Sequence, residues 1–528
     1  MTQPDKQPTQ IKETITSIII AFAMAFVFRG FVIEAFVIPT GSMAPTLLGA
    51  HMSFKSPYSG YEWTVGPQEY VPGTQNPTPV QRNVSVRDPM TGQALSQRNM
   101  PRSWGDRIFV MKYLYSVYDP KRWDVVVFKN PTDPGINYIK RLIGLPNEMI
   151  ALIDGDVFTL PVAPGEVINE DERLWGGNRW RAARKPQAAQ RAMWQPLFSS
   201  EYTPLNNASL QFVVPWVEPR EQTTQWKIAD RKDYEYTGAG PTSLTWHPGR
   251  AITDNVAYNE TSKGMAAVYP TSDIRMSLGI RPATDGQRVA AVVNARGHEF
   301  RAEVTGADVS LQMRRADGVS PNGEWKVLAS AALDEPMKAG TVTNVDFWHV
   351  DQSMSLFIND KRVAYAEYDW SPAERVQLSL GKSLDRIRSS PFELTNTANY
   401  KQAGAHFEFS GGAFTLYRVG LGRDIYYQPG AFGGNTGREG QIARAVSPQT
   451  TMVLNQNHFF TCGDNSPMSL DARLWGENNP WVSQIDPQQG VVHRDLLIGK
   501  AFLVYFPAPK KSPTQLPIPD FGATRFIW

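Results

Sequence analysis

The pattern of apolar and polar positions changes most sharply near the N-terminus. Residues 15–28 read ITSIIIAFAMAFVF without a charged side chain. Arg29 ends this run, but apolar residues follow up to Ile33, and the arginine can snorkel to the membrane interface. A helix needs roughly 20 residues to cross the hydrocarbon core of a bilayer. The pattern therefore predicts a transmembrane helix over residues 14–33, after a tail of residues 1–13. No second apolar run has this length, which predicts a single pass through the membrane.

Two alternatives to a retained anchor are a cleaved signal peptide and a buried core helix. A cleavage site would need small residues after the apolar run, and Phe36 stands where one is required. A short tail before a very large C-terminal part indicates a cytoplasmic N-terminus and an outward-facing globular part.

The remainder of the chain consists of short apolar and alternating runs separated by Gly, Pro, Asn and Asp. Such runs predict strands joined by turns. From about residue 205 to 428 the runs are regularly spaced, which predicts an inserted β-sandwich. The overall expectation is a mainly β protein with one N-terminal helix.

Composition narrows the classes of partner and cofactor. The 528-residue chain has 41% hydrophobic and 20% charged residues, which is typical of globular proteins. Its formal net charge of +2 and the lack of a basic stripe interleaved with aromatics predict no nucleic-acid partner. The one cysteine, Cys462, excludes an intrachain disulfide and a cysteine-based metal cluster. We expect no metal and no cofactor.

Five motifs carry the chemistry of the chain. Alone, a serine in a turn or a lysine in a strand is most often structural. In chain order the five are TGSMAPT (40–46), GDRIFVMK (105–112), DVVVF (124–128), YIKRLIGLP (138–146) and GDNSPMSLDAR (463–473).

Together and in this order, the motifs resemble the bacterial type I signal peptidases. The resemblance covers about a third of the chain and implies a signal-peptidase-type β-sheet or barrel core formed by residues 34–160 and 445–528. It implies a Ser-Lys dyad in which Ser42 is the nucleophile and Lys140 the general base. A serine hydroxyl needs an adjacent base, and burial can lower a lysine pKa far enough to supply one. Arg141, the next residue of the strand, should point to the opposite face.

The resemblance also assigns supporting residues. Ser469 matches the hydroxyl that orients the lysine, and Thr40 matches a side-chain donor of the oxyanion hole. Asp471 and Arg473 match a structural salt bridge behind the site, and Asp464 matches a supporting carboxylate.

The implied substrate is a secretory preprotein with a signal peptide, cut after a small-x-small motif at the bilayer surface. Phe36, Ile38, Leu47 and Ile139 match residues that line the substrate pockets, and the alternative is that they are ordinary core residues. The implied location is the bacterial inner membrane, with the lipid bilayer as a partner and the catalytic domain on the extracytoplasmic side.

Three positions depart from the family pattern. Asn147 stands where glycine is usual, and asparagine tolerates a positive φ better than most residues. Ala472 replaces a serine, and Ser466 stands where many members have arginine. No residue of the dyad is missing.

Residues 51–104 form an insert with two similar fragments, SPYSG (56–60) and DPMTG (88–92). Each has the outline of a zinc knuckle whose cysteines are replaced, so the insert resembles a degenerate zinc ribbon. Two unrelated turns are the alternative.

The second insert, the sandwich at 205–428, has a stretch at 345–363 that resembles the concanavalin-like jelly rolls. A glycan or a protein would be its ligand, with Trp348 and His349 as either a ligand platform or core residues. The alternative function of the whole chain is therefore an inactive homologue that acts as an anchored glycan- or protein-binding module.

Overall fold

The computed structural model is mainly β, which confirms the predicted fold class. It describes residues 7–67, 81–204, 210, 212–228, 231–262, 267–316, 323–433, 438–508, 510–511, 517–518 and 521–528. The α-helices of the described part are Gln7–Val27 (α1), Leu114–Val117 (α2), Glu170–Arg173 (α3), Gln187–Met193 (α4), Pro372–Leu380 (α5), Leu384–Ser389 (α6) and Pro480–Ile485 (α7).

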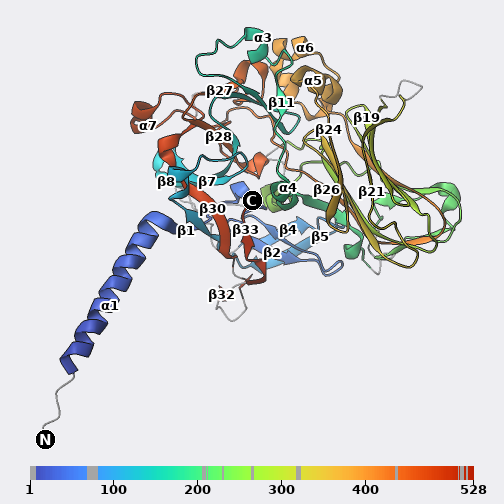
Figure 1. Ribbon diagram of the computed structural model, residues 1–528, viewed down its shortest axis with the longest axis horizontal. Coiled ribbons are helices and arrows are strands. Elements are labelled where there is room, and N and C mark those ends of the chain that lie inside the picture. Colours follow the sequence, from blue (N-terminus) through green and yellow to red (C-terminus); the bar gives the residue numbers. More distant parts are fainter. Residues whose placement is uncertain are drawn as a thin grey trace, which may run out of the picture.

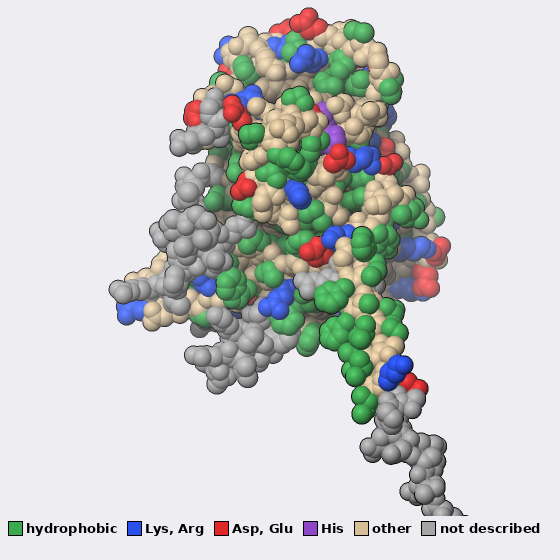
Figure 2. Space-filling view, turned by 90° about the vertical axis from the view of Figure 1, so that its left-hand side faces the viewer, with side chains coloured by type: hydrophobic (Ala, Val, Ile, Leu, Met, Phe, Trp, Pro, Cys, Tyr) green, Lys and Arg blue, Asp and Glu red, His purple; other side chains and the backbone are tan. Residues whose placement is uncertain are grey.

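Helix α1 projects from the globular body, and its described side chains are largely hydrophobic (Figures 1 and 2). The apolar span is Ile11–Val32, with a mean hydropathy of 2.1 and none of its window buried. Because none of this span is buried, the alternative that it is a core helix of the globular part does not hold. Residues 1–6 of the predicted tail lie outside the described residues.

The sheet that carries the dyad positions is built from segments at both ends of the chain. Its strand order places residues near position 500 between the strands of the second and third motifs. Among the described residues the order is Ile33–Val37 (β1), Arg107–Met111 (β6), Leu497–Phe506 (β30), Val125–Asn130 (β7), Asp133–Gly144 (β8), His458–Cys462 (β28) and Val492–His493 (β29), with Arg525–Phe526 (β33) beside β30.

A smaller sheet continues the chain from β8 and leads into the large insertion. Strand β9 is buried at every position, as expected for a strand covered on both faces. The strand order is Arg181–Ala182 (β11), Asp156–Pro161 (β10), Glu148–Ile153 (β9) and Met452–Leu454 (β27).

Two antiparallel sheets form the inserted sandwich, seen on the right of Figure 1. Alternate side chains point inward into a shared core, as the intermediate–buried alternation of Gly404–Ser410 (β25) shows. One sheet is Trp226–Lys227 (β14), Tyr234–Tyr236 (β15), Phe414–Arg423 (β26), Ile274–Pro282 (β17), Thr343–Val350 (β22), Ser353–Ile358 (β23) and Lys361–Glu367 (β24), with Gln195–Ser199 (β12) beside β26. The other is Trp216–Val217 (β13), Thr242–Trp246 (β16), β25, Arg288–Ala295 (β18), His298–Thr305 (β19), Asp308–Arg315 (β20) and Lys326–Ala332 (β21).

The first insert contains two β-hairpins that share a small core of their own. The hairpins are Met52–Lys55 (β2) with Glu62–Val65 (β3), and Gln81–Arg87 (β4) with Ala94–Met100 (β5). Outside this insert, near the C-terminus, Lys510–Lys511 (β31) pairs with Pro517–Ile518 (β32).

Candidate active site

Ser42 lies in a short 3-10 helix, Gly41–Met43 (η2), that follows the edge strand β1. The turn is closed by hydrogen bonds from Ala44 N to Gly41 O (3.0 Å) and from Leu47 N to Met43 O (2.9 Å). Asn465 holds it from the opposite side, donating its backbone N–H to Ser42 O at 3.0 Å. Asn465 belongs to the motif at residues 463–473, but no local pattern in the chain indicates that it fixes the serine turn.

Strand β8 brings Lys140 to Ser42. The Lys140 ammonium donates to Ser42 Oγ at 2.6 Å and to Ile139 O at 3.2 Å. The lysine is only 4% exposed. Burial lowers the pKa of Lys140 to about 8, against the opposing pull of nearby carboxylates such as Asp471. A large fraction of the amine is therefore neutral in mildly alkaline solution.

Ser469 lies beside the dyad without holding the lysine. Its Oγ is buried and makes no hydrogen bond of normal geometry with any residue that the structure describes, Lys140 included. It approaches the Asp471 carboxylate closely enough to help lower the pKa of that group. The orienting role expected for Ser469 remains a proposal.

Asp471 and Arg473 form a buried ion pair behind the site. Arg473 donates to Asp471 through Nε and Nη2, both at 2.8 Å. Burial alone would raise the pKa of Asp471, but the guanidinium holds this pKa below its ordinary value. Asp471 also accepts from the backbone N–H of Gly463 at 2.9 Å, which ties the pair to the loop carrying Asn465.

Asp464 pairs with Arg141 on the face of β8 opposite Lys140. Arg141 Nε and Nη2 donate to the two carboxylate oxygens at 2.8 and 2.7 Å, and both side chains are fully buried. Thr46 Oγ1 donates to the same carboxylate at 2.6 Å. Asp464 thus links the strand of Lys140 to the far end of the serine turn.

The four predicted pocket residues gather in one hydrophobic cluster with residues of β6, β7 and β30. Ile38 and Leu47 are buried, whereas Phe36 and Ile139 remain partly exposed. Phe36 and Ile139 can therefore contact a ligand directly. Ile38 and Leu47 pack behind them.

The departures from the family pattern fit their surroundings. Asn147 has a φ of 62°, the left-handed conformation that asparagine tolerates. Ser466 Oγ accepts from Arg473 Nη1 at 2.7 Å and from the backbone N–H of Gln428 at 2.8 Å, so it contributes to the network behind the dyad.

The two knuckle-like fragments of the first insert meet each other. Ser59 Oγ donates to Asp88 Oδ2 at 2.9 Å. Asp88 Oδ1 accepts the backbone N–H groups of Met90 (2.8 Å) and Thr91 (3.3 Å), and Ser56 Oγ accepts those of Tyr58 and Ser59. Hydroxyl and carboxylate groups of the two fragments thus hydrogen-bond to each other and to their own turns. The degenerate-ribbon interpretation of residues 51–104 stays a prediction.

Three buried carboxylates, those of Asp156, Asp273 and Asp351, have oxygens within 4.8 Å of one another. Each is already paired with a cation. The pairs are Asp156 with Arg375 (2.7 Å), Asp273 with Arg296 (2.8 Å) and Asp351 with Lys185 (2.6 Å). These guanidinium and ammonium groups supply the counter-charge, so we assign the cluster a structural role.

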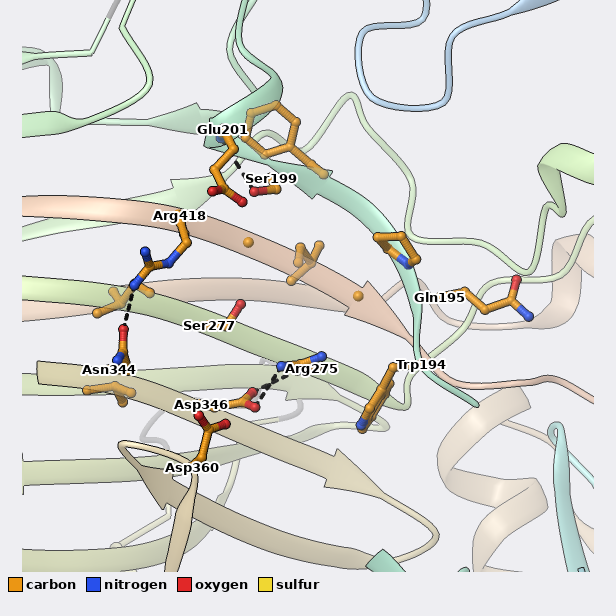
Figure 3. A pocket seen from close by; sticks show the side chains of 17 residues that line it. Trp194, Gln195, Ser199, Glu201, Arg275, Ser277, Asn344, Asp346, Asp360 and Arg418 are labelled. Atoms are coloured by element: carbon orange, nitrogen blue, oxygen red, sulfur yellow. Dashed lines mark hydrogen bonds and ion pairs between the residues drawn. The ribbon is translucent and has the colours of Figure 1, made fainter. Parts of the chain in front are cut away.

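A cavity of about 550 Å³ lies over β12, β17, β22 and β26 of the sandwich (Figure 3). Arg275 forms two hydrogen bonds with Asp346 (2.9 and 2.8 Å), and Arg418 donates to Asn344 at 2.7 Å. Trp348 and His349 are buried, so they form no exposed platform. A glycan or protein ligand of the sandwich stays a prediction.

Known proteins resemble the two parts of the chain separately. The family model described as signal peptidase, peptidase S26, matches residues 11–76 and 92–173, which include Ser42 and Lys140. Signal peptidase I of Rickettsia prowazekii is 30% identical over 149 residues, which cover 28% of this chain and 43% of the relative. Signal peptidase I of Buchnera aphidicola is 28% identical over 148 residues, covering 28% of this chain and 33% of the relative. The chain thus spans less than half the length of these relatives.

Solved structures resemble the chain only weakly. A carbohydrate-binding module from Bacillus subtilis has a TM-score of 0.20 and 12% identity, covering 39% of this chain and 89% of its own. A galectin from Caenorhabditis elegans has a TM-score of 0.17 and 13% identity, covering 29% and 82%. Likenesses this weak carry no argument about a ligand. Over residues 11–76 and 92–173 the chain is similar in sequence to the signal peptidases of peptidase family S26.

Proposed function

We propose that this chain is a membrane-anchored serine endopeptidase that removes signal peptides from preproteins through a Ser42–Lys140 dyad. The observation that carries the proposal is the 2.6 Å contact between Lys140 Nζ and Ser42 Oγ, made by a buried amine of lowered pKa. A nucleophile within hydrogen-bond reach of a neutral base is the arrangement that acyl transfer needs.

The reaction follows from these two groups. Neutral Lys140 takes the proton of Ser42 Oγ as the oxygen attacks the scissile carbonyl carbon. The carbonyl oxygen becomes an oxyanion, for which the Ser42 backbone N–H and the Thr40 hydroxyl are the proposed donors. The Thr40 side chain does not cap the turn, which leaves its hydroxyl for this task. The Lys140 ammonium then protonates the leaving amine, and water, deprotonated by the same lysine, hydrolyses the acyl-enzyme.

The proposed substrate segment is an extended strand cut after a small-x-small motif. Strand β1 ends its sheet, and β8 pairs with β28 only from Arg141 onward, so both have free backbone edges in the described structure. A peptide can add to such edges by backbone hydrogen bonds, with side-chain pockets giving specificity. Phe36 and Ile139, which share one cluster, are placed to limit the pocket to small side chains.

We further propose that α1 anchors the enzyme in the bacterial inner membrane, with the catalytic domain on the extracytoplasmic side. The apolar span of 22 residues, Ile11–Val32, runs through α1 and the π-helix Phe28–Val32 (η1) and is long enough to cross a bilayer. Anchoring confines the site to the surface at which a membrane-inserted preprotein presents its cleavage site, which raises the effective concentration.

Cleavage of a model preprotein by the detergent-solubilised full chain tests this function. We expect Ser42→Ala to lower turnover by at least about 10³-fold, because the nucleophile is lost. Ser85→Ala, at an exposed hydroxyl of β4, is the matched control and should behave as wild type. Equal absence of cleavage by wild type and Ser42→Ala would favour the inactive, ligand-binding alternative.

A further inference from the structure

The large insertion reaches back to the serine turn through one short helix, Ala257–Ser262 (η5). Tyr258 OH donates to Ala50 O at 2.6 Å. The backbone of the same segment joins the end of β3, with Gly66 N donating to Tyr258 O at 2.8 Å and Thr261 Oγ1 donating to Gly66 O at 3.0 Å. This segment lies outside the residues that match the signal peptidase family model.

The Tyr258 ring packs against the glycine that precedes the nucleophile. A Cβ atom on Gly41 would lie 2.0 Å from the Tyr258 ring, and one on Gly66 would lie 2.5 Å from it. The tyrosine is only 6% exposed. The ring therefore fills the space behind the turn so closely that neither glycine position admits a side chain.

Asn259 binds the residue that holds the turn. Its Nδ2 donates to Asn465 Oδ1 at 2.7 Å, and Asn465 Nδ2 donates back to Asn259 Oδ1 at 2.8 Å. The same Asn465 Nδ2 donates to Gly41 O at 2.9 Å, while its backbone N–H donates to Ser42 O. Asn465 is fully buried, so loss of Asn259 would leave its amide oxygen without this partner.

We propose that Asn259 is a positioning residue for Ser42, supplied by the insertion and acting through Asn465. The reciprocal amide pair fixes the Asn465 side chain, and Asn465 in turn fixes the carbonyls of Gly41 and Ser42. A catalytic turn must be held within roughly 0.5 Å of its productive geometry, so a loose turn misdirects both the Ser42 hydroxyl and its backbone N–H. The kinetic part of this inference rests on the proposed peptidase function.

Asn259→Ala in the full chain tests the kinetic part. We expect kcat to fall roughly 10- to 100-fold with KM changed less than about threefold, because positioning is lost while substrate contacts remain. The acid limb of the pH profile should not move, since Lys140 keeps its surroundings. The matched control is Asn344→Ala, in β22 of the sandwich, which removes another side-chain amide that is hydrogen-bonded, in this case with Arg418 and Asn359. An unchanged kcat in Asn259→Ala would overturn the proposal.

Hydrogen exchange gives a readout that does not need activity. The amides of Ala44, Leu47 and Asn465 are hydrogen-bonded within or onto the turn. We expect them to exchange about tenfold faster in Asn259→Ala than in wild type or Asn344→Ala. Unchanged exchange refutes the proposal even in an inactive protein, whereas faster exchange in a protein without peptidase activity supports it and rejects only the proposed function.

Asn259→Asp covers the case in which the alanine variant does not fold. Aspartate still accepts from Asn465 Nδ2 but no longer donates to Asn465 Oδ1. We expect both the amide exchange rates and kcat to lie between the wild-type values and those of a protein that lacks both hydrogen bonds of the amide pair. Wild-type values for both would count against a positioning role.

Discussion

Lys140 must be neutral to accept a proton, so its burial sets the pH range in which a dyad can work. Its neighbours act in both directions. The apolar surroundings lower its pKa, while the carboxylates of Asp471 and Asp464 raise it. Each carboxylate is paired with an arginine, which limits that opposing effect. The result is a pKa of about 8 in place of the ordinary 10.5.

This lowered pKa predicts the pH dependence of cleavage. Below about pH 8 the amine is protonated and cannot act as a base, so kcat/KM should rise with pH through that value. The measurement is a pH profile of kcat/KM with a model preprotein. Lys129→Met, at an exposed lysine of β7, should keep the same acid limb. A rate that does not change between about pH 6 and 9 would contradict a lysine base.

At the scale of single elements, hydrogen bonds around Asp88 join the two hairpins of the first insert. Asp88 is fully buried, and its two oxygens accept one side-chain and two backbone donors. These bonds connect the two knuckle-like turns. The small core formed by Trp63, Val84 and their neighbours packs beneath them.

Asp88→Ala should destabilise the insert by about 1–3 kcal/mol, because buried donors lose their acceptor. Chemical denaturation of the full chain measures the change. Asp88→Asn keeps one acceptor oxygen and should lose less, and the exposed Ser85→Ala should lose almost nothing. A transition that shifts in wild-type protein after treatment with a chelator would instead point to a bound metal.

At the scale of the whole molecule, the insertion is fastened to the smaller sheet by buried ion pairs. Asp154, between β9 and β10, accepts from Arg296 of the sandwich at 2.8 Å and from Arg375 of α5 at 3.0 Å. Ser379 donates to the same oxygen at 2.6 Å. Such a network fixes the orientation of the sandwich and, with it, the η5 segment.

Asp154→Ala should therefore destabilise the protein by about 3–5 kcal/mol, because two guanidinium groups lose a buried partner. The denaturant midpoint of the full chain in detergent is the measurement. Asp334→Ala removes an exposed ion pair with Lys361 and should change the stability by less than about 1 kcal/mol. If both variants unfold at the same denaturant concentration, the buried network does not stabilise the attachment of the insertion.

The resemblance carried by the five motifs implied the serine, the lysine and the ion pair of Asp471 with Arg473, because each motif keeps chemical groups at a fixed local spacing. The mainly β class followed from short alternating runs, for the same local reason. The positive φ of Asn147 could be anticipated from its side chain. These features depend on neighbours in the chain.

Only the tertiary structure decided which distant groups meet. The partner of Asp464 is Arg141, more than 300 residues earlier, and the partner of Asn465 is Asn259, within an unrelated insertion. Nor did the sequence reveal that Ser469 lacks a hydrogen bond to Lys140, or that the two knuckles face each other. Hydrogen bonds and ion pairs form only between groups a few ångströms apart. Two residues far apart in the chain have no characteristic spacing that would identify them as partners. The packing of sheets and insertions therefore determines which of them meet.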